Sequence, residues 1–394
     1  MTAAPPTSKA TVDKSPTTRS VCQMVLHARV VTETGGGPDK TILNSPRFLE
    51  GTNYRAECAY LYPPNDPGFA ALQKLAETSG AKLHGIEDRG PLDWRVVRDL
   101  AKLCRSLKVK IWHGHDYKTN ALGLLLRRFH RMHLVTTVHG WVKHTSRTPL
   151  YYWIDRKTLP LYDKVVCVSA DLEEQCLLAG VKRDRCHLIE NAIDTTQARR
   201  TLTREEAKVA SGYDPAIPLI GAVGRLSEEK GFDLLIEAVG RLHAMGNPVH
   251  LAIVGEGDQR QALETQIAAQ THPDRFHLVG FRGTLGTFYQ ALDVFALSSR
   301  REGLPNVLLE AMAYEAPVVA TAVAGIPRLI TDGMTGCLIA PNDVPQLQEA
   351  LARVLAEGSL QRSFSQAARQ TIVTRYDFAV RMQKMRTVYD ELFF

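Results

Sequence analysis

The chain has 394 residues, a length that favours two or more domains over one. It is 44% hydrophobic and 23% charged, which is the composition of a soluble globular protein. The net charge of +6 does not by itself indicate a class of partner. No apolar run approaches the ~20 residues that span a bilayer, and the N-terminus lacks the layout of a signal peptide.

The seven cysteines are widely scattered, and none forms a C-x-x-C pair or a zinc-type Cys/His spacing. This pattern predicts reduced thiols, a cytoplasmic location and no metal site. Residues 1–20 are rich in Pro, Thr and Ser and poor in apolar groups, so we expect a disordered tail.

From Gln23 onward, short β-branched runs alternate with segments of helical length. The alternation predicts a parallel sheet with helices on both faces, and we assign residues 21–191 to a first α/β domain. The expected strands are MVLHARVV, YRAECAYLY, VKIWHGH, HLVTTVHG and DKVVCVSA.

A second series of strands and helices occupies residues 216–375. Residues 192–215 are predicted to connect the domains and to carry one exposed helix, and residues 376–394 to form a terminal helix. We therefore expect two doubly wound, Rossmann-like sheets that face each other across a ligand-binding cleft. The expected strands are IPLIGAVG, VHLAIVGEG, RFHLVGF, DVFALSS and PVVATAVAG.

Two acids flank a predicted helix start in SSRREGLPNVLLEAMA. Pro305 favours a helix beginning there, which places Glu302 on the preceding loop and Glu310 about one turn inside. The free N–H groups of Asn306 and Val307 would then suit a phosphate, with the first acid facing a sugar and the second a ribose. An ordinary surface helix with solvated acids is the alternative.

Two cations follow the strand IPLIGAVG. Arg225 and Lys230 lie in the turn before a helix, where they can neutralise a diphosphate and the charge on a departing one. The alternative is a solvated loop in which both cations pair with Glu228 and Glu229.

The first domain offers weaker signals. The run Gly35, Gly36, Gly37 after the first strand permits close approach of a ligand, although a flexible turn explains it equally well. It is neither a dinucleotide fingerprint nor a P-loop. His139 ends the strand HLVTTV and could bond a sugar hydroxyl or share in proton transfer; a structural histidine is the alternative. His113 and His115 at another strand end carry less weight.

Taken together, these segments resemble glycosyltransferase family 4. The match runs from residue 23 to the end and is strongest over residues 217–340, where its motifs follow in the expected order. The resemblance implies the two-domain GT-B fold, retention of anomeric configuration, and no obligatory metal or cofactor. It departs from the family at Ala192, where glycine is common, and that affects only the connector.

The resemblance also implies roles for individual residues. Arg225 and Lys230 would contact the donor phosphates, Glu302 would orient the transferred sugar, and Glu310 would bind the ribose. His139 would lie beside the sugar. The backbone positions implied to meet the donor are Gly36, Gly37, Gly303, Leu304 and Asn306.

A basic region lies between Lys102 and Pro160, with twelve cations against two acids. Aromatic residues interleave it, among them Phe129, Trp141, Tyr151, Tyr152 and Trp153. Such a face can hold a protein at an anionic membrane surface, so the acceptor is predicted to be a lipid-linked glycan at the inner membrane face. A solvated helix face is the alternative, and no motif supports nucleic-acid binding.

The expected activity is transfer of a hexosyl group from a nucleotide diphosphate sugar to a hydroxyl of a glycan or lipid-linked glycan. Domain closure would assemble the site, because its parts lie on both domains. A sugar-nucleotide epimerase of the same fold and a non-enzymatic carbohydrate-binding protein are the alternatives. The donor base, the sugar and the linkage are not determined by these residues.

Overall fold

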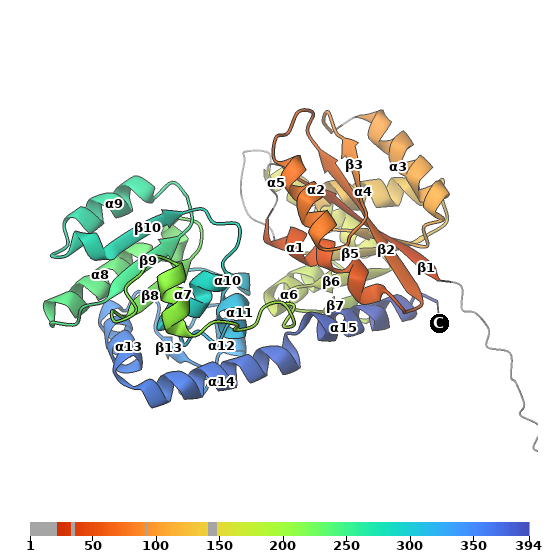
Figure 1. The fold of residues 1–394 in the computed structure, drawn as a ribbon. Helices are drawn as coiled ribbons and strands as arrows, with labels where there is room; N and C mark the ends of the chain where they lie inside the picture. Colours follow the sequence, from red (N-terminus) through yellow and green to blue (C-terminus); the bar gives the residue numbers. More distant parts are fainter. Residues whose placement is uncertain (1–21, 33–35, 92, 141–147, 394) are drawn as a thin grey trace, which may run out of the picture.

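The computed structural model describes residues 22–32, 36–91, 93–140 and 148–393. Over these residues the chain forms two α/β domains, each built on one parallel sheet (Figure 1). The first sheet has seven strands in the order β3-β2-β1-β4-β5-β6-β7, and the second has six in the order β10-β9-β8-β11-β12-β13. No described helix is long and apolar enough to cross a membrane.

The first sheet contains all five predicted strands and two further edge strands, β3 and β7. Its strands are β1 (Gln23–Val30), β2 (Tyr54–Tyr62), β3 (Leu83–Glu87), β4 (Ile111–Gly114), β5 (His133–Val138), β6 (Lys164–Cys167) and β7 (Cys186–Leu188).

Helices cover both faces of this sheet because successive strand residues point to opposite sides. Leu26, Trp112 and Leu134 pack against α3, α4 and α6, whereas Val25 and Ile111 lie in the core of the opposite face. The helices of this domain are α1 (Gly37–Asn44), α2 (Phe69–Thr78), α3 (Trp94–Leu107), α4 (Tyr117–Leu126), α5 (Thr148–Thr158) and α6 (Ala170–Leu178).

The second sheet contains the five predicted strands and one further edge strand, β13. Its strands are β8 (Leu219–Val223), β9 (His250–Val254), β10 (Phe276–Gly280), β11 (Val294–Leu297), β12 (Val318–Thr321) and β13 (Cys337–Ile339). Its helices are α7 (Arg204–Ala210), α8 (Phe232–Ala244), α9 (Arg260–Ala268), α10 (Gly286–Ala291), α11 (Asn306–Ala313), α12 (Ile326–Leu329), α13 (Val344–Ala356) and α14 (Gly358–Arg375).

Helix α7 is the helix expected in the connector, and it is only partly exposed. Ala207 and Lys208 are buried, and Lys208 forms an ion pair with Asp293 at 2.7 Å. The apolar side of α7 therefore joins the core of the second domain, which the local sequence did not indicate.

The chain crosses between the domains twice, and the two crossings lie side by side. Ile193 donates to the Tyr376 carbonyl and accepts from the Phe378 N–H, both at 2.9 Å. The final helix α15 (Phe378–Asp390) then packs on the first sheet, where Met382 and Tyr389 join its core (Figure 1). The C-terminal segment therefore belongs to the first domain by packing, although it follows the second in sequence.

Candidate active site

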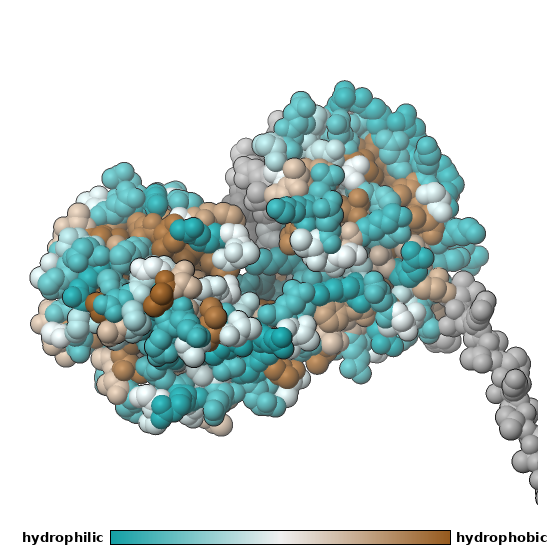
Figure 2. All heavy atoms as spheres, viewed as in Figure 1, coloured by the Kyte–Doolittle hydropathy of each residue, from teal (hydrophilic) through white to brown (hydrophobic). Residues whose placement is uncertain are grey.

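A cleft lies between the domains, at the carboxyl ends of both sheets. One pocket of about 580 Å³ is lined by Gly37 and Lys40 from the first domain and by Arg225, Asn306 and Glu310 from the second. A neighbouring pocket of about 310 Å³ shares Lys40, Asn306 and Glu310 with it. In Figure 2 the surface is hollowed between the domains, with hydrophilic residues visible in the hollow. Doubly wound sheets bind their ligands at this edge.

Arg225 follows β8 and lies at the pocket with its side chain exposed. Within the described residues it has neither an ion pair nor a side-chain hydrogen bond, so pairing with Glu228 or Glu229 is not found. An unpaired guanidinium at the mouth of a pocket is free to bind an anion with its planar fork of donors.

Lys230 is paired with a predicted site residue rather than with the neighbouring acids of its own turn. Its Nζ lies 2.6 Å from Oε1 of Glu302, and Ser299 Oγ donates to the same oxygen at 2.8 Å. The Glu302 side chain is only 7% exposed and that of Lys230 21% exposed. The ion pair therefore holds the carboxylate in one orientation in a mostly dry place.

Helix α11 begins where the sequence predicts, with Pro305 as the N-cap residue and Glu310 just beyond the first turn. Proline has no side-chain oxygen that could cap the first N–H groups, and Asn306 and Val307 line the larger pocket. The amide Oδ1 of Asn306 is buried without a hydrogen-bond partner among the described residues. The free backbone N–H groups of this helix start can therefore donate to a ligand anion, whereas Asn306 Oδ1 can only accept, as from a ligand hydroxyl.

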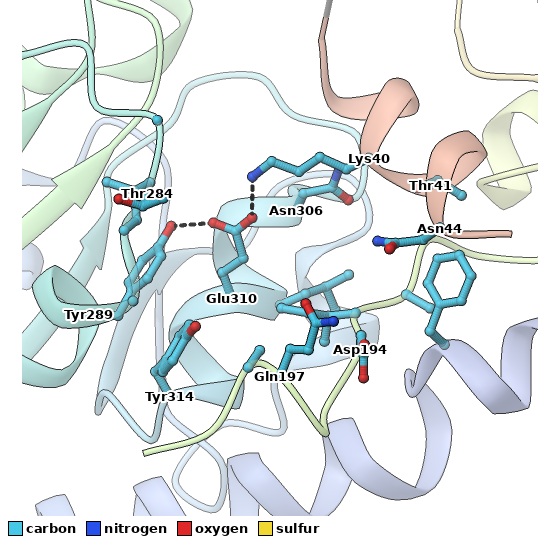
Figure 3. A pocket seen from close by; sticks show the side chains of 18 residues that line it. Lys40, Thr41, Asn44, Asp194, Gln197, Thr284, Tyr289, Asn306, Glu310 and Tyr314 are labelled. Carbon is cyan, nitrogen blue, oxygen red and sulfur yellow. Dashed lines mark hydrogen bonds and ion pairs between the residues drawn. The ribbon is translucent and has the colours of Figure 1, made fainter. Parts of the chain in front are cut away.

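Glu310 joins the two domains (Figure 3). Its Oε1 lies 3.0 Å from Lys40 Nζ of α1, and its Oε2 accepts from the Tyr289 hydroxyl of α10 at 2.9 Å. Burial, followed by the nearby Glu310 charge, raises the pKa of Tyr289 well above its usual value, so this hydroxyl stays a donor. Both carboxylate oxygens are thus engaged, one of them by the opposite domain.

The glycine loop of the first domain touches the second. A Cβ on Gly37 would lie 3.1 Å from Nδ2 of Asn306, a contact tighter than most side chains make, so the Asn306 amide would have to shift to admit a larger residue. The Gly36 N–H donates to Asp39 at 2.6 Å, which starts α1. Gly35 lies outside the described residues.

The remaining predicted residues lie outside both pockets. Gly303 is exposed, with its carbonyl accepting from Gly325 at 3.2 Å, and Leu304 packs on the core of the second domain. Lys230 lies beside the larger pocket, which Gly224 lines: a Cβ built on Gly224 would be 3.5 Å from Cδ of Lys230.

His139 is half-buried at the end of β5 rather than freely exposed, and its Nε2 lies 3.1 Å from Nδ1 of His115. Burial lowers the pKa of His139 well below its usual value, and the nearby Arg29 charge lowers it further, so the ring is neutral. His139 follows the carboxyl end of β5, and Gly36 follows that of β1, so both lie at the same end of the first sheet. Gly36 lines the larger pocket.

Sequence reasoning missed Lys40, Tyr289 and Ser299. Lys40 lies one turn into the helix that follows the glycine run. Its position close to a candidate ligand-binding loop is the signal that could have identified it. Ser299 lies three residues before Glu302, within the segment already singled out. Nothing near Tyr289 in the sequence indicated its contact with Glu310.

The arrangement brings Arg225, the start of α11 and Glu310 to one interdomain pocket, with the Lys230–Glu302 ion pair beside it. It is suited to holding a diphosphate, because a cation and free N–H donors line the same pocket. Glu302 and Glu310, on the two sides of the α11 start, can each accept hydroxyl hydrogen bonds.

Comparison with protein families gives two matches, one in each domain. Residues 203–371 match the family described as Glycosyl transferases group 1, and residues 56–197 match Glycosyltransferase Family 4. A lipopolysaccharide core biosynthesis mannosyltransferase, LpsB of Rhizobium meliloti, is 31% identical over 72% of this chain and 80% of its own length. The alpha-D-kanosaminyltransferase of Streptomyces kanamyceticus is 28% identical over 79% and 84%.

The fold is shared with solved glycosyltransferase structures. The Anabaena protein HepE, crystallised with UDP, aligns with a TM-score of 0.78 at 18% identity, covering 94% of this chain and 100% of that one. A sucrose-phosphate synthase from Thermosynechococcus elongatus aligns with a TM-score of 0.74 at 20% identity, covering 94% and 99%. The two facing parallel sheets are therefore those of the GT-B fold, and the chain is a glycosyltransferase that belongs to glycosyltransferase family 4.

Proposed function

We propose that the protein is a retaining glycosyltransferase that moves a hexosyl group from a nucleotide diphosphate sugar to a hydroxyl of a glycan or lipid-linked glycan. The observation that carries the proposal is the meeting of Arg225, the α11 start and Glu310 in one pocket. The unpaired cation and the helix start supply positive potential where a diphosphate would lie.

Protein groups take the part that a metal ion plays in other phosphate sites. Arg225 would neutralise the diphosphate together with the N–H groups of Asn306 and Val307, and Lys230 would lie beside it. Charge that develops on the departing diphosphate would meet donors already in place, which lowers the barrier without reorganisation. The proposed reaction therefore needs no metal ion.

Glu302 would stabilise and orient the transferred sugar. Its Oε1 already accepts from Lys230 and Ser299, and these two bonds fix the orientation of the carboxylate, which suits a group that positions the sugar. This supports attack by the acceptor on the face from which the diphosphate leaves, with retention of configuration. The anomeric configuration of the product, read by NMR against that of the donor, tests this step.

The donor nucleotide is proposed from the relatives. HepE has been crystallised with UDP-glucose, and a 25% identical Escherichia coli relative is named for transfer from UDP-Gal to a diphosphoundecaprenol-linked sugar. We therefore propose a UDP-sugar donor and a lipid-linked or cell-envelope glycan acceptor.

The proposed experiment is a thermal-shift panel of UDP-, GDP- and ADP-sugars, followed by assay of the best binder with and without acceptor. A UDP-sugar should raise the melting temperature, and Arg225→Ala should erase most of that rise without changing the melting temperature of the free protein. An Arg225→Ala variant that keeps the full rise would contradict the proposed site.

The acceptor would be reached at an anionic membrane surface. Phe129 and Trp153 are 63% and 60% exposed, and Arg127 and Arg128 beside Phe129 are exposed as well. Cations near such a surface contribute roughly 1 kcal/mol each, and exposed aromatic rings suit the interface. Trp141 lies outside the described residues, and the side chains of Tyr151 and Tyr152 are not described. Equal pelleting with anionic and neutral vesicles would overturn this part of the proposal.

A further inference from the structure

Four histidines pack together beneath the cleft edge of the first sheet. His27 lies in β1, His113 and His115 lie at the end of β4, and His139 follows β5. Neighbouring strands bring them together, since His27 and His113 are paired in register. The rings of His27, His113 and His115 are stacked, with centroids 4.5 to 5.2 Å apart.

Three of these rings form a hydrogen-bonded chain. Nδ1 of His27 lies 2.9 Å from Nε2 of His115, and Nδ1 of His115 lies 3.1 Å from Nε2 of His139. His27 Nε2, at the inner end, is buried without a partner among the described residues. At the outer end, Nδ1 of His139 has no protein partner in the described part of the chain.

All three rings are neutral. His27 and His115 are 2% and 7% exposed. Burial lowers the pKa of His27 to about 3 and that of His115 well below its usual value, and neighbouring charges add to both effects. A neutral imidazole carries one N–H, so each ring donates through one nitrogen and accepts through the other.

The chain therefore has two states. In the first, every ring carries its proton on Nδ1, so His27 donates to His115, His115 donates to His139, and His139 keeps an outward N–H. In the second, every proton lies on Nε2, which leaves an N–H of His27 buried without an acceptor. A buried N–H without an acceptor is rare in proteins and costs free energy, whereas a buried acceptor without a donor occurs more often. The first state is therefore favoured.

Positive charge lies near both ends of the chain. Arg381 of α15 is buried and lies close enough to His27 to oppose protonation of that ring, and Arg29 and Arg381 oppose protonation of His139. These cations help to keep the rings neutral but do not select between the two states, so the choice rests on the buried Nε2 of His27.

We propose that His27 and His115 are positioning residues, which hold the proton of His139 on Nδ1 and so present a hydrogen-bond donor at the cleft edge of the first sheet. A free neutral histidine side chain prefers its proton on Nε2, so the hydrogen-bonded chain would give His139 the opposite tautomer. This consequence rests on the proposed function: if His139 lies beside the transferred sugar, as the resemblance to the family implies, it would donate to a sugar oxygen and would not accept a proton through Nδ1.

A metal ion is the rival explanation for clustered histidines, and His27, His113 and His115 could bring one nitrogen each within 4.8 Å of the others. Ligand rings must aim their lone pairs at one centre, whereas these rings are stacked with interplanar angles of 12 to 30°. Both nitrogens of His113 are also engaged, by the Tyr389 hydroxyl and by Thr137 Oγ1, each at 2.7 Å. The hydrogen-bonded chain fits these contacts better.

The direct test is the tautomer of His139 in the intact wild-type protein. Long-range ¹H–¹⁵N NMR of histidine-labelled protein at pH 7.5 distinguishes Nδ1–H from Nε2–H, and single His→Asn variants assign the signals. We expect Nδ1–H on His27, His115 and His139. A proton on Nε2 of His139, or a stoichiometric metal ion found by plasma mass spectrometry and lost in His27→Asn, would overturn the proposal.

Two substitutions of His27 whose side chains have the same shape test the coupling along the chain directly. In His27→Asn the side-chain amide can replace the Nδ1 donor, so His139 should keep Nδ1–H. In His27→Asp an acceptor stands at the inner end, ionised beside Arg381, and the chain should reverse to place the proton of His139 on Nε2. Burial lowers the pKa of His115 well below its usual value, and neighbouring groups that include Arg29 lower it further, so that ring stays neutral. A His139 tautomer that is the same in both variants would contradict coupling along the chain.

An activity measurement then links the tautomer to the sugar. We expect kcat/KM for UDP-glucose hydrolysis to be about 2- to 12-fold lower in His27→Asp than in His27→Asn, the range for one lost hydrogen bond, with the affinity for UDP unchanged. Equal kcat/KM values would refute the role at the sugar. If the wild type neither binds nor cleaves UDP-glucose, the proposed function fails, while the NMR result still decides the tautomer.

Discussion

Replacing Lys230 with methionine keeps an unbranched side chain only one atom shorter and removes its charge. Within the described residues, Ser299 would then be the one remaining side-chain partner of Glu302, whose side chain is only 7% exposed. Breaking a buried ion pair by removing one partner costs about 3–5 kcal/mol. Because Lys230 itself is 21% exposed, water can reach part of the vacated space, and we expect about 2–3 kcal/mol.

A thermal melt of the free protein measures this loss. For a domain of this size, a loss of that magnitude lowers the melting temperature by roughly 4–12 °C. The matched double variant Lys230→Met with Glu302→Gln removes the uncompensated charge and should recover more than half of the loss. Arg225→Ala is the control, since that side chain is exposed and unpaired within the described residues and should leave the melting temperature unchanged.

The reasoning would be refuted by a Lys230→Met protein that melts at the wild-type temperature. It would also fail if Glu302→Gln did not rescue Lys230→Met, because the loss would then come from packing of the lysine stem rather than from a stranded carboxylate.

Three further predictions concern contacts elsewhere in the molecule. Lys40→Met should strengthen UDP binding by up to about 5-fold in calorimetry, because the half-exposed lysine occupies an oxygen of Glu310; weaker binding would place Lys40 on the diphosphate instead. Gly231→Ala should lower the melting temperature well below that of Gly212→Ala, because both have positive φ but only the first would put a Cβ 2.2 Å from a backbone carbonyl. Stability should fall below pH 6.5, since burial lowers the pKa of His27 to about 3 while the unfolded chain titrates at its usual value. The native state then binds fewer protons, and this one ring costs about 1.4 kcal/mol per pH unit as pH drops towards 3. Urea unfolding measures this effect, and an equal free energy of unfolding at pH 7 and pH 5 would contradict the predicted loss of stability at lower pH.

Strand positions in the interior of both sheets could be read from the sequence. Central strands of parallel sheets are covered on both faces, so they carry continuous apolar runs such as HLVTTV and LIGAV. The missed strands β3, β7 and β13 all lie at sheet edges and are short, for example LHGIE, which is half-exposed. An edge strand has one neighbour, and LHGIE shows how weak its apolar pattern becomes when it is also half-exposed; the edge strand β10, with the more apolar run RFHLVGF, was predicted.

The sequence also determined which segments bear the candidate site, because the motif near Glu302 and Glu310 and the turn with Arg225 and Lys230 are local. Only the tertiary structure decided what these groups touch. Lys40 reaches Glu310 across 270 positions of sequence, and His27, 88 positions before His115, completes the histidine chain. Spacing along a chain records helix turns and strand ends, whereas contacts between domains and between strands depend on how the sheets are ordered and closed against each other. The state of each carboxylate and imidazole therefore follows from packing that the sequence does not display.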